Sequence, residues 1–387
     1  MSAFPYVRVS GGPYERGRAY GEQAGDRVAT SIVAYREVFQ EYAGWDWANV
    51  REQAAAYLPL IAARYPKAVE EMRGIAAGAG TDQNDILAIN VRTEVMFAAK
   101  ARQAEASGAL PAECSAFAAL PEASTNGHTL IGQNWDWLLH CEDTVVVLEA
   151  EQDDGPDFVT VVEAGLLAKT GMNSSGIGLA TNALVTNDDR GEPGLPYHVM
   201  LRMILDAEVI SDALEALQVG RRSSSANYLV AHRDGIAVDI EAAPGDFSRL
   251  YLTYPEDGVI LHTNHFLTPR LHARDVSTWA MPDSPFRLER LRAATRAAGA
   301  TLSLDDFRGM LADHANFPSG VCCHPDPRLG RLEQGATVAS VLMDLDERTM
   351  WVADGHPCTV EYRRLDYGTF LSKASPLRPD PSVHLAG

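Results

Sequence analysis

The chain has 387 residues, of which 46% are hydrophobic and 22% are charged, and this composition excludes a disordered protein. Its 33 lysines and arginines against 52 aspartates and glutamates give a formal net charge of −19. A body this acidic repels phosphate backbones and anionic lipids, so we expect neither a nucleic-acid partner nor a membrane partner.

The start of the chain has no charged stretch followed by an apolar one, and no apolar run reaches the ~18 residues of a membrane helix. We therefore expect a cytoplasmic protein. The five cysteines are an odd number spread over a long chain. This pattern predicts reduced thiols rather than a disulfide framework.

Residues 14–106 have the spacing of amphipathic helices. Apolar residues recur every three or four positions over 27–42 and again over 54–77. Residues 81–85 resemble the N-cap and acidic first turn of a further helix. The small and polar residues of 103–112 then predict an exposed loop.

From residue 114 onward, short strands separated by turns dominate. The sequence predicts strands at 114–120, 129–137, 144–149, 158–163 and 178–182. It also predicts three hairpins, which pair 228–231 with 236–242, 250–254 with 259–263, and 338–344 with 350–353. The predicted helices of this part are 197–217, 285–298 and 304–313. Antiparallel strands interrupted by long helices predict an α+β fold in which helices cover the sheets.

Two residues of neighbouring strands are candidates for catalysis. Cys114 opens the first strand in the stretch AECSAF, although a lone strand cysteine is more often a small hydrophobic residue. Asp136 stands in the next strand, in IGQNWDW, and Asn126-Gly127 predicts a tight hairpin between the two strands. Asp136 would then fold back towards Cys114, where a carboxylate can hold an amine or orient a thiol. The alternative is an aspartate that caps a turn.

Three asparagines stand at predicted strand ends, namely Asn173, Asn182 and Asn264. A neutral amide donor at such a place suits a developing oxyanion, where one donor is worth about 3 kcal/mol. Most asparagines at strand ends satisfy turns, so each residue alone leaves both roles open.

The order of these motifs resembles that of the acyl-coenzyme A:6-aminopenicillanic acid acyltransferase family (peptidase family C45), which belongs to the N-terminal nucleophile (Ntn) hydrolases. The motifs are GPYERG at 12–17, the strand-opening Cys114, GQNWD at 132–136, GMN at 171–173 and HTNH at 262–265. The resemblance runs from about residue 11 to residue 357, and the cysteine followed by GQNWD is its specific part. It implies a four-layer αββα sandwich of antiparallel sheets flanked by helices.

The resemblance also implies that the chain cuts itself between Glu113 and Cys114. The helical segment 1–113 and the catalytic segment 114–387 would then be two pieces of one structural domain. Cys114 would attack the preceding carbonyl, and the N→S acyl shift followed by hydrolysis would free an α-amine. With an ordinary pKa of about 7.7–8.0, this amine serves as the base for its own thiol.

In such a site Asp136 would hold the amine and the thiol in place. The Asn264 side chain and a backbone N–H near Asn182 would form the oxyanion hole, and the acyl group would rest on Cys114 as a thioester. The sequence departs from the family pattern at two places. Glu113 replaces a common glycine before the nucleophile, and Cys323 stands where relatives tend to carry an arginine.

We expect an enzyme that hydrolyses or transfers the acyl group of a small acylated amine, without a metal or an organic cofactor. An acyl-CoA-dependent transferase is the first alternative, although a chain of charge −19 offers few basic groups for CoA phosphates. An inactive homologue that binds a small molecule is the second. The sequence leaves open whether the chain forms homo-oligomers.

Other residue clusters give weaker predictions. Cys322-Cys323-His324 has no Cys-x-x-Cys partner, and adjacent strand cysteines face opposite ways, so no metal is predicted there. His262 and His265 are expected to be structural neighbours of Asn264. A papain-type pair of Cys114 with His314 or His324 lacks the local signature of that family.

Overall fold

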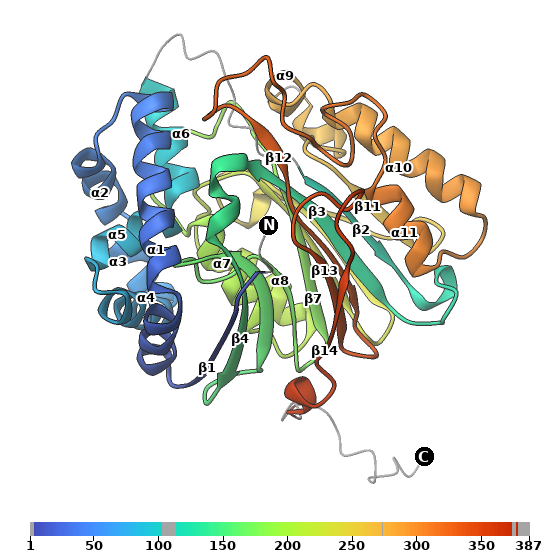
Figure 1. The fold of residues 1–387 in the computed structure, drawn as a ribbon, viewed down its shortest axis with the longest axis horizontal. Coiled ribbons are helices and arrows are strands. Elements are labelled where there is room, and N and C mark those ends of the chain that lie inside the picture. Colours follow the sequence, from blue (N-terminus) through green and yellow to red (C-terminus); the bar gives the residue numbers. More distant parts are fainter. Residues whose placement is uncertain (1–3, 103–113, 273, 374–376, 378–387) are drawn as a thin grey trace.

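The computed structural model describes residues 4–102, 114–272, 274–373 and 377, which form two β-sheets with helices on both outer sides (Figure 1). The predicted loop at 103–112 and Glu113 lie outside the described residues. Among the described helices, none combines the length and the hydropathy that crossing a bilayer requires.

The strands belong to one eight-stranded and one six-stranded sheet. They are β1 (Tyr6–Gly11), β2 (Cys114–Ala119), β3 (Leu130–Leu138), β4 (Val145–Gln152), β5 (Phe158–Glu163), β6 (Thr170–Asn173), β7 (Ile177–Ala183), β8 (Ala226–His232), β9 (Ile236–Ala242), β10 (Leu250–Thr253), β11 (Val259–His262), β12 (Gly335–Asp344), β13 (Thr349–Ala353) and β14 (Arg363–Asp366). The order is β1-β4-β5-β6-β7-β8-β9-β10 in the larger sheet and β11-β2-β3-β12-β13-β14 in the smaller one. Neighbouring strands are antiparallel except β1 and β4, which run parallel.

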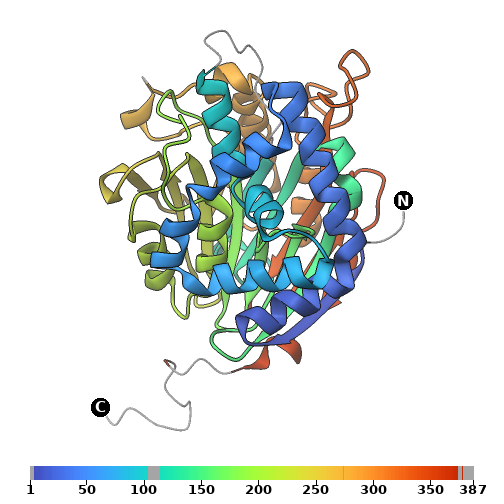
Figure 2. The same cartoon turned by 90° about the vertical axis from the view of Figure 1, so that its left-hand side faces the viewer.

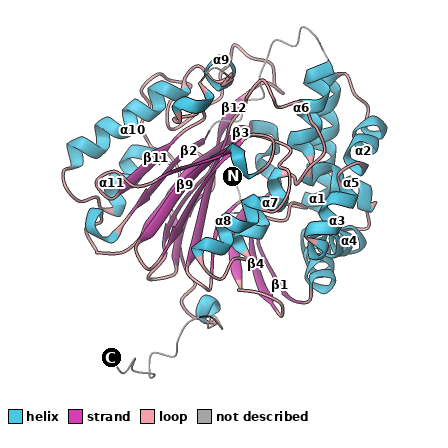
Figure 3. Ribbon diagram, turned by 180° about the vertical axis from the view of Figure 1, so that it is seen from behind, coloured by secondary structure: helices cyan, strands magenta, loops and turns pink. Residues whose placement is uncertain are grey.

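The helices lie in two groups on opposite sides of the sheets. The first group is α1 (Pro13–Ala43), α2 (Trp47–Ala55), α3 (Leu58–Arg64), α4 (Pro66–Ala79), α5 (Gln83–Asn90), α6 (Arg92–Arg102), α7 (Tyr197–Leu205) and α8 (Ile210–Gln218). Figure 2, which views the molecule from that side, shows these helices in front of the strands. The second group contains α10 (Ser284–Ala298) and α11 (Leu304–Leu311), with the short α9 (Ser277–Ala280) before them (Figure 3).

The two sheets pack face to face because successive side chains of a strand alternate between two environments. Along β2, Cys114 and Ala116 join the core between the sheets, whereas Phe117 joins the cluster under α10 and α11. Phe117 stacks on Phe307 of α11 with ring centroids 3.7 Å apart. The predicted α+β fold with four αββα layers is confirmed.

Proline accounts for one interruption in the predicted helices. The pattern at 54–77 predicts one helix, but α2, α3 and α4 share this stretch. Tyr65 leaves the helical conformation directly before Pro66, because a proline disfavours that conformation in the preceding residue. The predicted helix 197–217 likewise divides into α7 and α8.

The predicted hairpin of 250–254 with 259–263 is wrong. Its turn forms, because Glu256 and Val259 exchange backbone hydrogen bonds across Asp257 and Gly258, which both have positive φ. The flanking strands then separate: β10 pairs with β9 in the larger sheet, and β11 pairs with β2 in the smaller one. This crossing brings the end of β11 next to the start of β2. The sequence pattern also missed β1 and β6.

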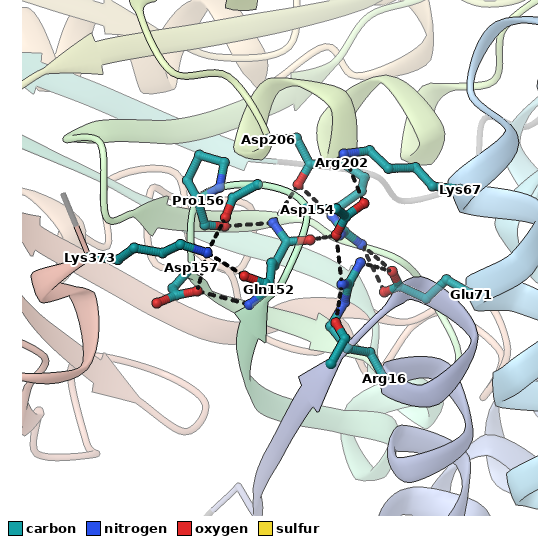
Figure 4. Close-up of polar contacts among 12 residues, drawn as sticks. Arg16, Lys67, Glu71, Gln152, Asp154, Pro156, Asp157, Arg202, Asp206 and Lys373 are labelled. Carbon is teal, nitrogen blue, oxygen red and sulfur yellow. Dashed lines mark hydrogen bonds and ion pairs between the residues drawn. The ribbon is translucent and has the colours of Figure 1, made fainter. Parts of the chain in front are cut away.

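A buried ion-pair network joins the helical segment to the rest of the chain (Figure 4). Arg16 of α1 contacts Glu71 of α4 at 3.1 Å and Asp154, beyond β4, at 2.9 Å. Arg202 of α7 reaches both oxygens of Glu71 at 2.8 Å and Asp206 at 3.2 Å. Lys67 adds a further ion pair to Asp206 at 2.9 Å. Three cations and three carboxylates thus neutralise one another across the two segments.

Candidate active site

Cys114 is the first residue of β2 and faces the larger sheet. It pairs with Trp135 in the β2–β3 hairpin that Asn126-Gly127 predicts, and its side chain is only 4% exposed. The backbone N–H of Asp136 donates a hydrogen bond to its sulfur. Burial raises the pKa of the thiol to about 11, although the charge of Lys169 opposes the rise. The thiol therefore needs a base in order to act as a nucleophile at neutral pH.

Asp136 lies next to this thiol with an incompletely paired carboxylate. Thr337 of β12 donates its hydroxyl to Asp136 Oδ1 at 2.5 Å, whereas the buried Oδ2 has no hydrogen-bond partner among the described residues. Burial raises the pKa of Asp136 to about 7, although Arg287 and Thr337 oppose the rise. A carboxyl group that titrates near neutrality beside a thiol is suited to accept its proton.

Asn264 and Asn182 hold the backbone of Cys114 from two sides. Asn264, which follows β11, accepts the Cys114 N–H on Oδ1 at 2.6 Å. Asn182 of β7 donates from Nδ2 to the Cys114 carbonyl at 3.0 Å. Asn264 Nδ2 donates to the Ala183 carbonyl at 2.9 Å. An oxyanion hole formed by the Asn264 side chain and a backbone N–H near Asn182 stays a prediction.

The orientation of Asn182 is fixed by a buried chain of polar groups behind it. Asn227 of β8 donates to Asn182 Oδ1 at 3.2 Å and to Asp239 Oδ1 at 2.7 Å. His262 Nε2 lies 3.8 Å from Asp239 and 3.0 Å from Glu241 Oε1. Because the Asn182 oxygen accepts from Asn227, its nitrogen is left to donate towards Cys114.

Arg287 of α10 completes the contacts around Cys114, and the sequence motifs did not indicate it. Its guanidinium donates to the Cys114 carbonyl at 2.9 Å, to Ser115 Oγ at 3.1 Å and to Asn264 Oδ1 at 3.0 Å. Asp283, one turn earlier, accepts from its Nε at 2.5 Å. A sequence signal existed, because Arg287 shares the apolar face of its predicted helix with Leu288 and Leu291.

Lys169 is a second residue that the motifs did not indicate. Its ammonium lies 4.5 Å from the ring centroid of Trp135, the residue opposite Cys114. Burial lowers the pKa of Lys169, while its interaction with the Cys114 thiol acts in the opposite direction. A buried ammonium in this position favours the thiolate over the thiol.

The other sequence candidates have structural contacts. Asn173 donates to the carbonyls of Leu205 and Ala207, and its Oδ1 accepts the N–H groups of Gly176 and Ile177 in the turn between β6 and β7. His265 contacts Ser284 through Nδ1 at 2.8 Å. The two histidines of the papain-type alternative, His314 and His324, contact each other at 3.0 Å, and within the described part of the chain neither forms a hydrogen bond with Cys114.

The sequence matches the model of a known protein family. The family model of acyl-coenzyme A:6-aminopenicillanic acid acyl-transferase matches residues 123–358, which is more than half of the chain. The chain belongs to this family. The predicted resemblance to this acyltransferase family is confirmed, and with it the expectation of an enzyme. Cys114 itself precedes the matched residues.

A relative in sequence and two solved structures extend the comparison. The acyl-coenzyme A:6-aminopenicillanic-acid-acyltransferase 40 kDa form of Emericella nidulans is 26% identical over 91% of this chain and 93% of its own length. A variant of conjugated bile acid hydrolase from Clostridium perfringens has 13% identity and a TM-score of 0.48 over 67% of this chain and 94% of its own. Penicillin V acylase from Agrobacterium tumefaciens has 14% identity and a TM-score of 0.42 over 67% and 88%.

Proposed function

We propose that the chain cuts itself before Cys114 and then uses this cysteine to hydrolyse or transfer the acyl group of a linear amide. The set of side chains on the Cys114 backbone carries the proposal. Asn264 accepts its N–H, while Asn182 and Arg287 donate to its carbonyl. Strand residues ordinarily satisfy these groups with neighbouring strands, so three buried side chains here indicate a residue whose exact placement matters.

Self-cleavage would begin with attack of the Cys114 sulfur on the Glu113 carbonyl carbon. Asp136 accepts the thiol proton on Oδ2, the sulfur–carbon bond forms, and the carbon–nitrogen bond of Cys114 breaks. The leaving nitrogen takes the proton from Asp136, which gives an α-amine and a thioester on Cys114. Water then hydrolyses the thioester, so that Glu113 ends in a carboxylate and the thiol is restored.

The freed amine would become the base for turnover. It keeps its place on Asn264 Oδ1, which already accepts the Cys114 N–H at 2.6 Å. Its ordinary pKa of about 7.7–8.0 lets it take the thiol proton near neutral pH, and Lys169 supports the thiolate that results. The thiolate attacks the substrate amide, the amine leaves with the proton, and the acyl group stays on sulfur.

Segments 1–113 and 114–387 would remain one structural domain after the cut. The network of Arg16, Glu71, Asp154 and Arg202 crosses between them and is buried at its centre. Because removing either segment would expose unpaired charges and the core beneath α1, dissociation is strongly unfavourable.

The acceptor decides between hydrolysis and transfer, because both start from the same thioester. We assign small acylated amines as substrates and water as the main acceptor, since CoA phosphates would meet a chain of charge −19. Transfer from acyl-CoA is the second candidate, and the named activity of the Emericella nidulans relative favours it.

A partition experiment tests the shared thioester. Two amides with one acyl group and different leaving amines are incubated with the purified protein and a fixed concentration of a competing amine. One acyl-enzyme predicts the same ratio of free acid to new amide from both, and from the matching acyl-CoA if it is a donor. Ratios that depend on the leaving amine, or turnover that survives in Cys114→Ala, would overturn the proposal.

A further inference from the structure

Four side chains with metal-binding donor atoms, none of them among the contacts of Cys114 described above, converge on one point. His314, Cys322 and His324 lie in the long connection between α11 and β12, and Cys358 lies between β13 and β14, so two separate segments contribute. Their donor atoms all lie within 4.8 Å of one another. Residues 322–324 alone predict no metal site. In the structure the second thiol of the cluster comes from Cys358, and not from Cys323 next to Cys322.

The spacing of the donor atoms fits a tetrahedral ion. His324 Nε2 lies 3.5 Å from Cys322 Sγ, 3.4 Å from Cys358 Sγ and 3.0 Å from His314 Nε2. Zinc bonds of about 2.3 Å to sulfur and about 2.0–2.1 Å to nitrogen give tetrahedral edges of about 3.6 Å for S–N and about 3.4 Å for N–N. A small movement of the exposed His314 would lengthen the 3.0 Å distance between the two histidine nitrogens to the N–N edge of about 3.4 Å.

We propose that His314, Cys322, His324 and Cys358 bind one Zn²⁺ ion in a closed structural site. Two thiolates and two neutral imidazoles balance the charge of the ion, and two thiol protons are released when it binds. Tetrahedral S₂N₂ coordination is typical of zinc, and four protein ligands leave no position for a substrate or an activated water.

The adjacent Cys323 is excluded from the site by its direction. Its sulfur lies 3.8 Å from the Gly335 carbonyl and 4.0 Å from the His324 carbonyl, and it is not one of the four converging donor atoms. The pair of cysteines therefore provides a ligand and a matched control in neighbouring positions.

The ion would brace the loop that supports the strand of Asp136. Asn134, two residues before Asp136, donates to the carbonyls of Leu311 and Val321 at 2.8 Å each. Cys323 N–H donates to Thr337 Oγ1, the same hydroxyl that donates to Asp136. Zinc would link this loop to Cys358, which follows β13. The ion would thereby stabilise the loop residues that contact Asn134 and Thr337 beside Asp136.

Metal analysis of the purified full-length protein tests the proposal. We expect one zinc per chain by elemental analysis, and replacement by Co²⁺ should give the intense visible absorption of a tetrahedral thiolate site. Cys322→Ser and Cys358→Ser should each weaken zinc binding at least about 100-fold, since even outer-shell partners are worth 10–100-fold. Cys323→Ser should keep one zinc per chain.

Two results would overturn the proposal. One is a protein without zinc, after expression and purification with zinc supplied, whose Cys322 and Cys358 thiols both react with an alkylating reagent. The other is a disulfide between these two cysteines, which peptide mass analysis would detect. Because the readout is bound metal, neither result depends on whether the chain hydrolyses amides.

Discussion

Two buried polar clusters of the molecule differ in how completely their charges are paired. In the network of Arg16, Glu71 and Arg202, each charged group meets an opposite charge within 3.1 Å. Although burial acts to raise it, Arg202 and Lys67 hold the pKa of Asp206 well below its usual range. Around Cys114, burial outweighs the nearby cations and raises the pKa of the thiol to about 11.

The difference indicates separate tasks. In the Glu71 network each carboxylate is paired with a cation across the two segments, which suits it to join them. Near Cys114, Asp136 has a pKa raised to about 7 and an oxygen without a hydrogen-bond partner in the described part of the chain, so this carboxyl can gain and lose a proton near neutral pH. We therefore assign chemistry to the Cys114 cluster and cohesion of the two segments to the Glu71 network.

The largest expected effect is the loss of turnover when Cys114 is replaced. Cys114→Ala removes the nucleophile, so turnover per folded molecule should fall by about 10⁵–10⁶-fold, as for other covalent catalysts. Hydrolysis of a small N-acyl amide measures it. Cys141→Ser, which changes another buried cysteine outside the site, should leave turnover within a few fold if the protein folds. Equal losses in both variants would contradict the assignment.

The second change breaks the paired network. Glu71→Gln leaves the buried Arg16 and Arg202 without their shared carboxylate, which should cost about 3–5 kcal/mol of unfolding free energy. Urea unfolding of each variant in the uncut Cys114→Ala background measures this unfolding free energy. Glu70→Gln is the control, because its exposed pair with Arg73 is worth at most about 1 kcal/mol. Equal unfolding free energies for the two variants would contradict the proposed role of the network.

Arg287 tests whether the contacts on the Cys114 backbone matter for the reaction. Arg287→Leu should slow self-cleavage by about 10²-fold, because the nucleophile loses its positioning. Arg290→Leu, on the exposed side of the same helix, should cut at the normal rate. Arg287→Leu should also shift the pH midpoint of cleavage upward, since Arg287 lowers the pKa of Asp136. A slower rate with an unchanged midpoint would indicate a purely structural role.

The smallest effect is the pH dependence of self-cleavage. Asp136 accepts a proton only as a carboxylate, and burial raises its pKa to about 7. The cleavage rate of freshly translated chain should therefore rise with pH through about 7, and Asp136→Asn should lose this inflection. Gel time courses between about pH 5.5 and 8.5 measure it. An unchanged inflection in Asp136→Asn would assign the titration to another group.

Local signals predicted the fold well where contacts are local. The predicted antiparallel pairing of β2 with β3 is confirmed, and it places Trp135, the neighbour of Asp136, opposite Cys114. The turn at Asp257-Gly258 also formed, but no local signal shows that its two strands join different sheets. Strand choice depends on which edges the finished core leaves available, and that is a property of the whole chain.

The candidate site shows the same limit. Motif order predicted Cys114, Asp136, Asn182 and Asn264, because the family resemblance supplied the long-range pairing. Arg287 reaches the Cys114 carbonyl from a helix more than 170 positions along the chain. Its place on an apolar helix face is a visible signal, but the partner of a buried charge cannot be inferred from spacing alone.

The intact mass of the purified protein shows whether Cys114 becomes a chain terminus. We expect two polypeptides, with the second beginning at Cys114, and a single uncut polypeptide for Cys114→Ala. An active protein that remains one chain, or whose second chain begins at another residue, would contradict this expectation.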